Sequence, residues 1–446
     1  MIRMERLPTH LDRSVFNVQL PNMDMNLTKA VQRMDAALPF TLPKLLALPT
    51  VQPVSMARSF MAAQHVLTRP SLQSMPKPRR LLPELPPLPD TPRCEPRRAD
   101  LLDNDDDLKE LLNKREVRTL VVGIGGAGNN MISRFQQLGI PRCRTLCVNT
   151  DVQDLYYSNA DEKILIGKRL TKGLGSGNNY EIGELAARED YERLKAVMDA
   201  DVVFLTGGMG GGTGTGATPL IAKAAKDRGA IVVSVVTMPF QMEGPTKQAI
   251  AYQGLRSLAE SSDTVIPLAN QKLVSLVPDI KLHQGFKIMD EVLTRSVRSI
   301  IDIVTRPGLV NIDFADIKSI IEKRSSGIKD AMYSTSVIGM TEITNVDDEE
   351  KLKRYTVKAL NNPLIEPDTS EIKHALVGIT GDYNVSLRQV NTVVSTVQEH
   401  INPAANVKFG FIQDPSMRHK MRITVMGTGF KSPMLEHAFS MPEMHV

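Results

Sequence analysis

The sequence predicts an α/β fold built around a parallel sheet, preceded by a long segment without regular structure. Glycine-rich segments follow apolar, strand-like runs and precede helical patterns, as in strand–loop–helix units. The apolar runs at 202–205 and 230–236 are nearly continuous, as expected for strands covered on both faces. Composition divides the chain, because residues 1–100 hold 15 of the 28 prolines and none of the 29 glycines.

Residues 1–107 form a Pro-rich, Gly-free extension that we expect to be mostly disordered. Prolines interrupt regular structure repeatedly, and no glycine is present to make the tight turns of a compact domain. Apolar residues between 27 and 38 recur at helical spacing. They are compatible with a helix on a partner or membrane, or with a transient helix in a disordered tail. A targeting peptide is a third alternative, because the first 80 residues are poor in acids and contain arginines. A helix is then predicted over 108–116, leading into the folded part.

Charge and cysteine content exclude several classes of protein. The net charge of the 446 residues is only +4, whereas a dedicated nucleic-acid-binding protein would show a concentrated basic face. The three cysteines are too few and too irregularly spaced for a disulfide scaffold or a zinc site. Since no charge-free apolar run reaches about 18 residues, no transmembrane helix is predicted. The expectation is a cytoplasmic protein with no nucleic-acid partner.

The folded part opens with a strand over 117–122, a glycine loop over 123–130 and a helix through Leu138. Glycines in this loop match the G-x-G-x-x-G fingerprint, and Asp151 follows the next strand, 145–148, at the distance expected of a ribose-binding acid. One match of this kind is weak evidence for a dinucleotide. It predicts phosphate binding, with a tight structural turn as the alternative.

Two further glycine loops favour a nucleoside triphosphate over a dinucleotide. Residues 173–179 precede a helix over 181–187, and residues 207–216, seven of them glycine, precede a helix that is expected to begin near 217–219. Backbone amides without a Cβ nearby can close on phosphate oxygens, and a helix N-terminus favours negative charge. Because no G-x-x-x-x-G-K-[ST] motif occurs, the site is not a P-loop.

Residues 207–217 closely resemble the signature of the tubulin/FtsZ superfamily, in its FtsZ form. The resemblance covers about 117–430 and continues through several ordered motifs, at 148–151, 166–168, 173–175, 239–240, 243–244, 307–316 and 423–430. A series of motifs in order is far more specific than any one of them. The chain is thus similar to FtsZ, with a long N-terminal extension added.

The resemblance implies a tubulin/FtsZ fold in three parts. A Rossmann-like GTPase domain at 108–304 would end in a long central helix, about 282–304. A GTPase-activating loop and a C-terminal α/β domain would occupy 305–430, with strands near 337–340, 373–379, 407–411 and 420–426. Residues 431–446 would be a short flexible tail.

The same resemblance implies a GTPase that polymerises head to tail with copies of itself and acts in cell division, in the cytoplasm at the division site. Its ligands would be GTP or GDP, with Mg²⁺ on the phosphates. One alternative is an FtsZ-like filament or scaffold with little turnover and a non-division role. An NAD-dependent oxidoreductase is a remote third, disfavoured by the number of glycine loops.

Residues carried over from the family define the nucleotide contacts. Asn270 and Asp290 fall where the family contacts guanine, Glu243 where it contacts ribose, and Phe286 where it could stack on the base. Locally, Asn270 could instead cap a helix, Asp290 could be a solvated helix position, and Phe286 could belong to the core. The resemblance places GTP contacts at Gly125, Gly126, Ala127, Asn129, Asn149, Asp151, Gly175, Ser176, Gly177, Gly208, Met209, Gly210, Gly211, Gly212, Thr213, Gly214, Thr215, Gly216, Glu243, Lys247, Asn270, Phe286 and Asp290.

Catalysis is expected from Asn311, Asp313 and Asp316. Read locally, Asp313 is a helix N-cap and Asp316 occupies the third helical position, which would be a structural reason for both acids. In the family, this loop lies opposite the nucleotide and inserts into the neighbouring subunit, where its acids orient the attacking water. Hydrolysis would then require assembly.

Three positions depart from the family pattern. Asn178 replaces a flexible residue, although asparagine tolerates left-handed backbone geometry. Lys247 stands where arginine is common, and Pro245 is unusual in that loop. The short ending also lacks the family's long linker and binding peptide. Attachment to a membrane or a membrane adaptor is therefore expected through the N-terminal extension.

Overall fold

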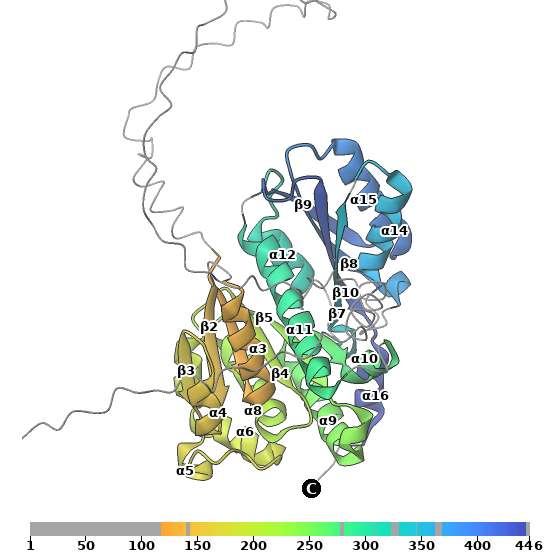
Figure 1. The fold of residues 1–446 in the computed structure, drawn as a ribbon. Coiled ribbons are helices and arrows are strands. Elements are labelled where there is room, and N and C mark those ends of the chain that lie inside the picture. The colour runs from red at the N-terminus through yellow and green to blue at the C-terminus, as the bar shows by residue number, and fades with distance from the viewer. Residues whose placement is uncertain are drawn as a thin grey trace, which may run out of the picture. The chain divides into compact units, whose positions relative to one another are not determined.

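The computed structural model describes residues 117–139, 143–276, 281–306, 308–322, 330–344, 346–361 and 368–442. The N-terminal extension and the helix expected over 108–116 lie outside these residues. Within the described ranges, no helix combines the length and the apolar character needed to cross a bilayer. Figure 1 shows two groups of strands and helices joined by one long helix, α11.

The first six strands form a parallel sheet in the order β3-β2-β1-β4-β5-β6. Their bounds are β1 Thr119–Ile124, β2 Cys143–Asn149, β3 Glu162–Leu165, β4 Val202–Gly208, β5 Ile231–Met238 and β6 Thr264–Ala269. The chain order reverses between β1 and β4, as in a doubly wound fold. Ligands bind such sheets in the crevice at the carboxyl ends of the strands beside this reversal.

Helices cover both faces of this sheet. Their bounds are α3 Gly125–Gln137, α4 Val152–Tyr157, α5 Lys168–Thr171, α6 Tyr180–Glu189, α7 Tyr191–Val197, α8 Gly212–Asp227, α9 Pro245–Ser261 and α10 Asn270–Leu276. Successive strand residues alternate between two cores: Phe204 packs with the α3 side, whereas Val203 and Leu205 pack with the α8 side. The continuous apolar runs of the sequence follow from this double coverage, as predicted.

Helix α11, Leu282–Thr305, leads to α12, Phe314–Ile321, and to the second group of strands. This group has the order β7-β10-β8-β9, in which β10 is antiparallel to both neighbours and β8 and β9 are parallel. The bounds are β7 Thr335–Thr344, α14 Glu349–Leu360, β8 His374–Gly381, α15 Leu387–His400, β9 Asn406–Gln413 and β10 Lys420–Phe430. One residue pair, Val265 with Thr335, joins β6 to β7, so the ten strands form a single sheet.

The expected flexible tail is wrong for the described residues after 430. Pro433–Ser440 forms helix α16, with proline in its first turn. Leu435 and Ala438 are buried, and the His437 ring stacks edge-on against Tyr252 of α9 with ring centroids 4.6 Å apart. Because this helix packs on α9, the end of the chain returns to the first group of helices.

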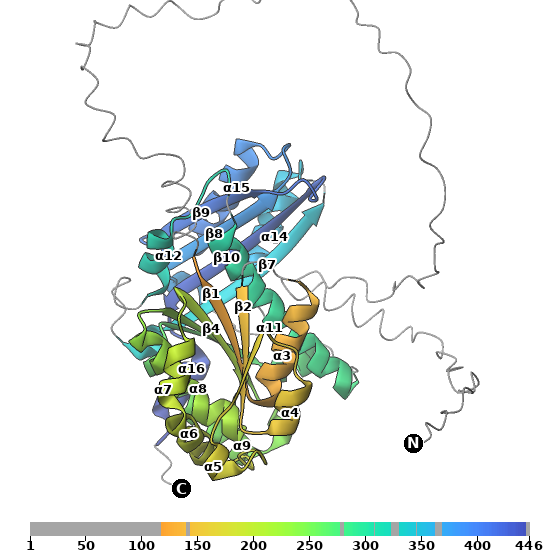
Figure 2. The ribbon, with the colours of Figure 1, turned by 90° about the vertical axis from the view of Figure 1, so that its left-hand side faces the viewer.

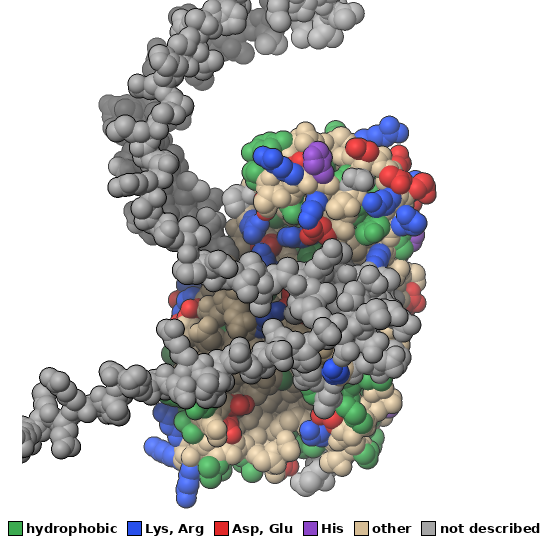
Figure 3. Space-filling view, in the orientation of Figure 1, with side chains coloured by type: hydrophobic (Ala, Val, Ile, Leu, Met, Phe, Trp, Pro, Cys, Tyr) green, Lys and Arg blue, Asp and Glu red, His purple; other side chains and the backbone are tan. Residues whose placement is uncertain are grey.

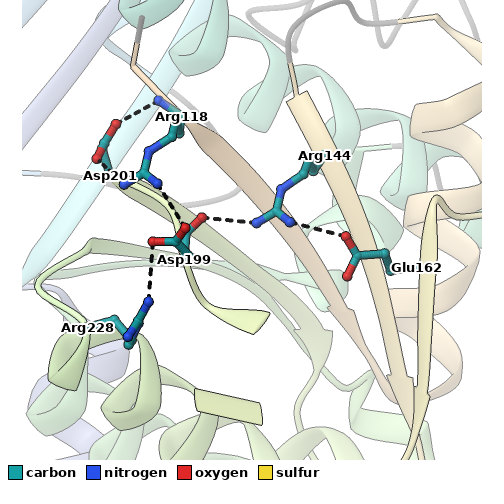
Figure 4. Close-up of polar contacts among 6 residues, drawn as sticks. All are labelled: Arg118, Arg144, Glu162, Asp199, Asp201 and Arg228. Carbon is teal, nitrogen blue, oxygen red and sulfur yellow. Dashed lines mark hydrogen bonds and ion pairs between the residues drawn. The ribbon is translucent and has the colours of Figure 1, made fainter. Parts of the chain in front are cut away.

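The amino ends of the parallel strands carry a network of ion pairs (Figure 4). Arg118 pairs with Asp199 at 2.9 Å and with Asp201 at 3.0 Å, while Arg228 reaches Asp199 at 3.4 Å. Arg144 connects Glu162 to the backbone of Asp199. Exposed pairs of this kind contribute little individually. They mark the edge of the sheet opposite the expected ligand crevice.

Charged side chains of both signs appear on the face drawn in Figure 3. Among the residues coloured there, Lys and Arg side chains gather at the lower left edge, and Asp and Glu side chains gather at the upper right.

Candidate nucleotide site

A cavity of about 420 Å³ opens at the carboxyl ends of β1, β2, β4 and β5, beside the reversal of strand order. It is lined by residues of all three glycine-rich segments, by Thr237 near the end of β5 and Pro239 just after it, by Asn270, and by the first half of α11. This volume lies in the range of small-molecule sites. All three glycine-rich segments therefore meet at one cavity, although the loop expected over 123–130 is instead the end of β1 and the first turns of α3.

Two helices point uncapped N-termini at this cavity. The N-cap residues are Ile124 for α3 and Gly211 for α8, and neither makes a side-chain cap hydrogen bond. Gly125 has a φ of +69°, and a Cβ on Gly126 would lie 2.8 Å from the Asp154 carboxylate. The free amides of both first turns, combined with both helix dipoles, form an anion site made of backbone.

Helix α8 begins at Gly212, five residues before the expected start. The whole glycine run, 207–216, was predicted to be a loop, but its second half is helical. The glycines of that half allow α8 to pack closely against its neighbours. A Cβ on Gly214 would overlap the Gly208 carbonyl oxygen, and one on Gly216 would overlap the Tyr180 carbonyl oxygen of α6. These glycines therefore serve the packing of α8 as well as the cavity.

Replacing Gly216 with alanine should destabilise the nucleotide-free protein by about 2 kcal/mol or more, because the added methyl group meets backbone that cannot turn away. Gly211→Ala is the matched control, since a Cβ at Gly211 meets nothing within 4 Å. Urea denaturation of both variants measures the difference. Equal stabilities would contradict this account of the glycine run.

Hydrogen bonds connect the loop over 173–179 to the residues that follow β2 and to the start of α8. Gly175 N donates to Thr150 O at 3.2 Å, and Val152 N donates to Gly173 O at 3.0 Å. The Thr213 hydroxyl lies 2.6 Å from that of Thr150 and 3.1 Å from that of Ser176, so α8 joins the same network. Asp151 caps α4, with its carboxylate accepting from Gln153 N and Asp154 N.

Asn178 adopts the left-handed conformation that asparagine was expected to tolerate there, with a φ of 63° beside Gly177 at 60°. The departure from the family pattern therefore leaves this loop in a left-handed turn. Lys247, the second departure, forms an ion pair with Glu243 at 3.1 Å. Pro245 is the first residue of α9, a position where proline costs no hydrogen bond.

Polar and aromatic side chains gather at the end of the cavity formed by α10 and α11. Asn270 begins α10, and its buried Oδ1 has no hydrogen-bond partner among the described residues. Phe286 is 45% exposed and meets Phe240 edge to face at 5.6 Å, so it is not a core residue. An orphaned acceptor beside an exposed ring fits a planar, hydrogen-bonding base.

Asp290 lies among these residues, and burial raises the pKa of its carboxyl to about 6, against an opposing effect of Arg134. Within the described part of the chain, no hydrogen bond reaches this carboxylate. A desolvated carboxylate without a donor is a strong acceptor for a ligand that brings N–H groups.

The described charged side chains that line the cavity are all acidic, so its positive character comes only from backbone N–H groups. Asp151, Asp154, Glu243 and Asp290 line it, and none of its described lining residues is Lys or Arg. Nor do the described residues contain a cluster of three metal-ligating side chains. A magnesium ion here would be held chiefly by phosphate oxygens, with one or two carboxylates at most.

Most of the predicted nucleotide contacts line the cavity, and five do not: Asn129, Gly210, Thr215, Gly216 and Lys247. Asn129 is buried and supports the loops. Its side-chain amide is oriented so that the nitrogen donates to Gly123 O at 3.2 Å and the oxygen accepts from Asn149 Nδ2 at 3.0 Å. Thr215 and Gly216 line a separate hollow between α6, α8 and α9.

Sequence reasoning missed several lining residues: Ile124, Thr150, Asp154, Leu174, Asn178, Thr237, Pro239, Met289 and Leu293. Thr150 and Asn178 stand inside motifs that were recognised. Asp154 could have been found as the residue one turn after the Asp151 cap.

The three predicted catalytic residues lie together, away from the cavity. Asp313 is the N-cap residue of α12, yet its exposed carboxylate makes no cap hydrogen bond. Asn311 accepts from Gly308 N at 2.6 Å, and Asp316 pairs with Lys408 at 3.0 Å. Between Asp290 and this loop, α11 continues for fifteen residues, from 290 to 305, about 22 Å of helix.

Comparisons with known proteins agree with this geometry. The model of the Tubulin/FtsZ family, GTPase domain, matches residues 118–278, and that of the FtsZ family, C-terminal domain, matches residues 335–431. Cell division protein FtsZ 1 of Archaeoglobus fulgidus is 39% identical over 75% of this chain and 88% of that protein. Cell division protein FtsZ 1 of Pyrococcus abyssi is 40% identical over 76% of this chain and 88% of that protein.

Among solved structures, the empty FtsZ dimer of M. jannaschii superposes with a TM-score of 0.65 at 40% identity, covering 73% of this chain and 92% of that one. The uncovered part of this chain is about the length of its N-terminal extension. With both domain models matched in order and relatives covered over most of their length, the chain belongs to the FtsZ family of tubulin-like GTPases.

Proposed function

We propose that this protein binds GTP and hydrolyses it within head-to-tail polymers that serve cell division. The observation that carries the proposal is the separation of the acidic loop from the cavity, by about 22 Å of α11. Neither end is complete alone, because the acids that are expected to orient water lie outside the cavity and have no nucleotide of their own. Stacking two subunits would bring the two ends together.

Each part of the cavity has a role in binding. The amides of the α3 and α8 first turns hold the phosphates without side-chain cations. Phe286 stacks on the base, and the orphaned Asn270 Oδ1 and the Asp290 carboxylate accept from guanine N–H groups. Adenine would leave these acceptors unpaired, which gives selectivity for guanine.

The affinity for GTP should fall as pH drops below about 6. The raised pKa of Asp290 means that its carboxyl carries a proton below that pH in the empty site, whereas guanine needs the ionised form. Binding must then release the proton, which costs about tenfold in affinity per pH unit. Calorimetry between pH 5 and 8 measures this, and Asp290→Asn, which cannot titrate, should lose the dependence. A flat profile in the unmodified protein would contradict it.

In the polymer, the Asp313 and Asp316 carboxylates orient a water molecule toward the terminal phosphate of the neighbouring subunit's GTP. Phosphoryl transfer depends on positioning and charge stabilisation more than on covalent chemistry. Magnesium, when bound, neutralises charge on the phosphates. Because Asp313 makes no cap hydrogen bond, its carboxylate is free for this task.

Exposed apolar side chains at both ends support the head-to-tail contact. Leu174 of the cavity lining is exposed, as are Tyr156 and Tyr157 at the end of α4, and at the acidic loop Leu309 and Val310 are exposed. Apolar groups around two polar centres are typical of interface surfaces. A relative of this chain, the FtsZ of M. jannaschii, has been solved as a dimer.

The proposal predicts that the GTPase rate per subunit rises with protein concentration above a threshold. With GTP and Mg²⁺, right-angle light scattering should increase at the same threshold at which phosphate release accelerates. A rate per subunit that is independent of concentration would defeat the shared site. Scattering without phosphate release would favour the alternative, a filament or scaffold with little turnover and a non-division role.

The N-terminal extension, which lies outside the described residues, is proposed to attach the polymer to a membrane or a membrane adaptor at the division site. Its arginines and helical apolar spacing motivate this role. Deleting residues 1–100 should delocalise a fluorescent fusion in cells while leaving polymerisation intact. Unchanged localisation would rule out this role.

A further inference from the structure

The acidic loop is fixed to the edge strand β9. Leu309 N donates to Phe411 O at 2.8 Å, and Phe411 N donates to Val310 O at 3.0 Å. A Cβ on Gly410 would lie 2.9 Å from the Ile312 side chain, so the loop lies closely against the strand. The β9 side chains near Phe411 therefore move with the loop as one unit, on the face proposed to meet the next subunit.

Lys408, three residues before Phe411 on β9, reaches the acid cluster. Its Nζ lies 3.0 Å from Asp316 Oδ1, and both side chains are about one-third exposed, at 39% and 35%. The lysine on the same helix as Asp316 is engaged elsewhere, because Lys318 pairs with Glu322 at 3.9 Å. Asp316 thus takes its cation from β9. Helix α12 lies beside the β9 edge of the sheet (Figure 2).

The negative charge gathered at the proposed contact between subunits is the reason why the Lys408 ammonium group matters. Four carboxylates line the cavity without any Lys or Arg among its described lining residues. The loop would add two more carboxylates against a triphosphate, so like charges would oppose the approach of Asp316 to the reacting phosphate. A lysine carried on the loop's own side offsets that repulsion and restricts the carboxylate to one orientation.

We propose that Lys408 is a positioning residue for GTP hydrolysis, holding the Asp316 carboxylate in place as it meets the nucleotide of the next subunit. This inference rests on the proposed shared site. Lys408 acts through Asp316, so it affects turnover in the polymer. It has no part in nucleotide binding, because the cavity of its own subunit lies at the far end of α11.

The experiment compares full-length Lys408→Met and Lys408→Arg with a matched control, Lys318→Met, which removes a paired lysine from α12 without touching Asp316. Phosphate release is measured per sedimented subunit, together with the KM for GTP and the affinity of the unassembled subunit. Lys408→Met should lower kcat about tenfold, with KM and affinity unchanged. Lys408→Arg should stay near the unmodified rate because it keeps the charge, and Lys318→Met should be unaffected.

Several results would overturn the role of Lys408. They are an unchanged kcat in Lys408→Met, an Arg variant as slow as the Met variant, an equal loss in Lys318→Met, or a loss of sedimentation in place of turnover. Asp316→Ala, run in parallel, separates the two levels of the proposal. If it retains full activity, the shared site itself fails; if it is inactive while Lys408→Met is normal, only the role of Lys408 fails.

Discussion

Replacing Asp313 or Asp316 with alanine should abolish GTP hydrolysis, by about 10³-fold or more, while leaving GTP binding intact. Both acids lie about 22 Å of helix away from the cavity of their own subunit, so binding does not need them. Folding should also survive, because Asp313 makes no cap hydrogen bond and Asp316 holds only a partly exposed ion pair.

Phosphate release and equilibrium binding of GTP measure the two properties separately. Glu350→Ala serves as the control, because Glu350 is an exposed acid on α14, outside the loop. If an alanine variant loses GTP binding or unfolds, the acids are structural, as their positions at the start of α12 would also allow.

Replacing Asp290 with asparagine should weaken GTP binding about 100-fold and remove the preference for guanine. The asparagine places an N–H group where the carboxylate accepts, and guanine presents only donors to that position. The change is nearly isosteric, so the loss of affinity for GTP measures the loss of hydrogen bonding. Asparagine carries no charge, so the substitution removes the desolvation cost that raises the Asp290 pKa, and the empty protein should not be destabilised.

A comparison of GTP with ITP, which lacks the 2-amino group, isolates this contact. The unmodified protein should prefer GTP, and Asp290→Asn should bind both nucleotides equally. Asp302→Asn, at the other end of the same helix, is the matched control. A guanine preference that persists in Asp290→Asn would assign specificity to another residue, with Asn270 as the first candidate.

The sequence predicted those features that depend on local chemistry. Glycine loops after apolar runs identified the strand–loop–helix units, and near-continuous apolar strands predicted a sheet covered on both faces. Asn178 was expected to tolerate a left-handed conformation, and its φ is 63°. The long central helix, implied by the family resemblance at about 282–304, is α11, Leu282–Thr305.

Features that depend on contacts between distant segments could not be predicted. The early start of α8 follows from the fit of Gly214 and Gly216 against Gly208 and α6, which no local pattern reveals. Helix α16 is short, and burial of Leu435 and Ala438 against α9 stabilises it. The Lys408–Asp316 pair joins residues far apart in the sequence.

The most direct test of the shared site mixes two variants that are each inactive. Asp316→Ala keeps an intact cavity, and Asp290→Asn keeps an intact acidic loop. The assay uses a GTP concentration that saturates the cavity of Asp316→Ala but not that of Asp290→Asn. Co-assembly should restore phosphate release, because some joints then pair a filled cavity from one variant with a working loop from the other. A mixture no more active than the sum of its parts would contradict an active site completed between subunits.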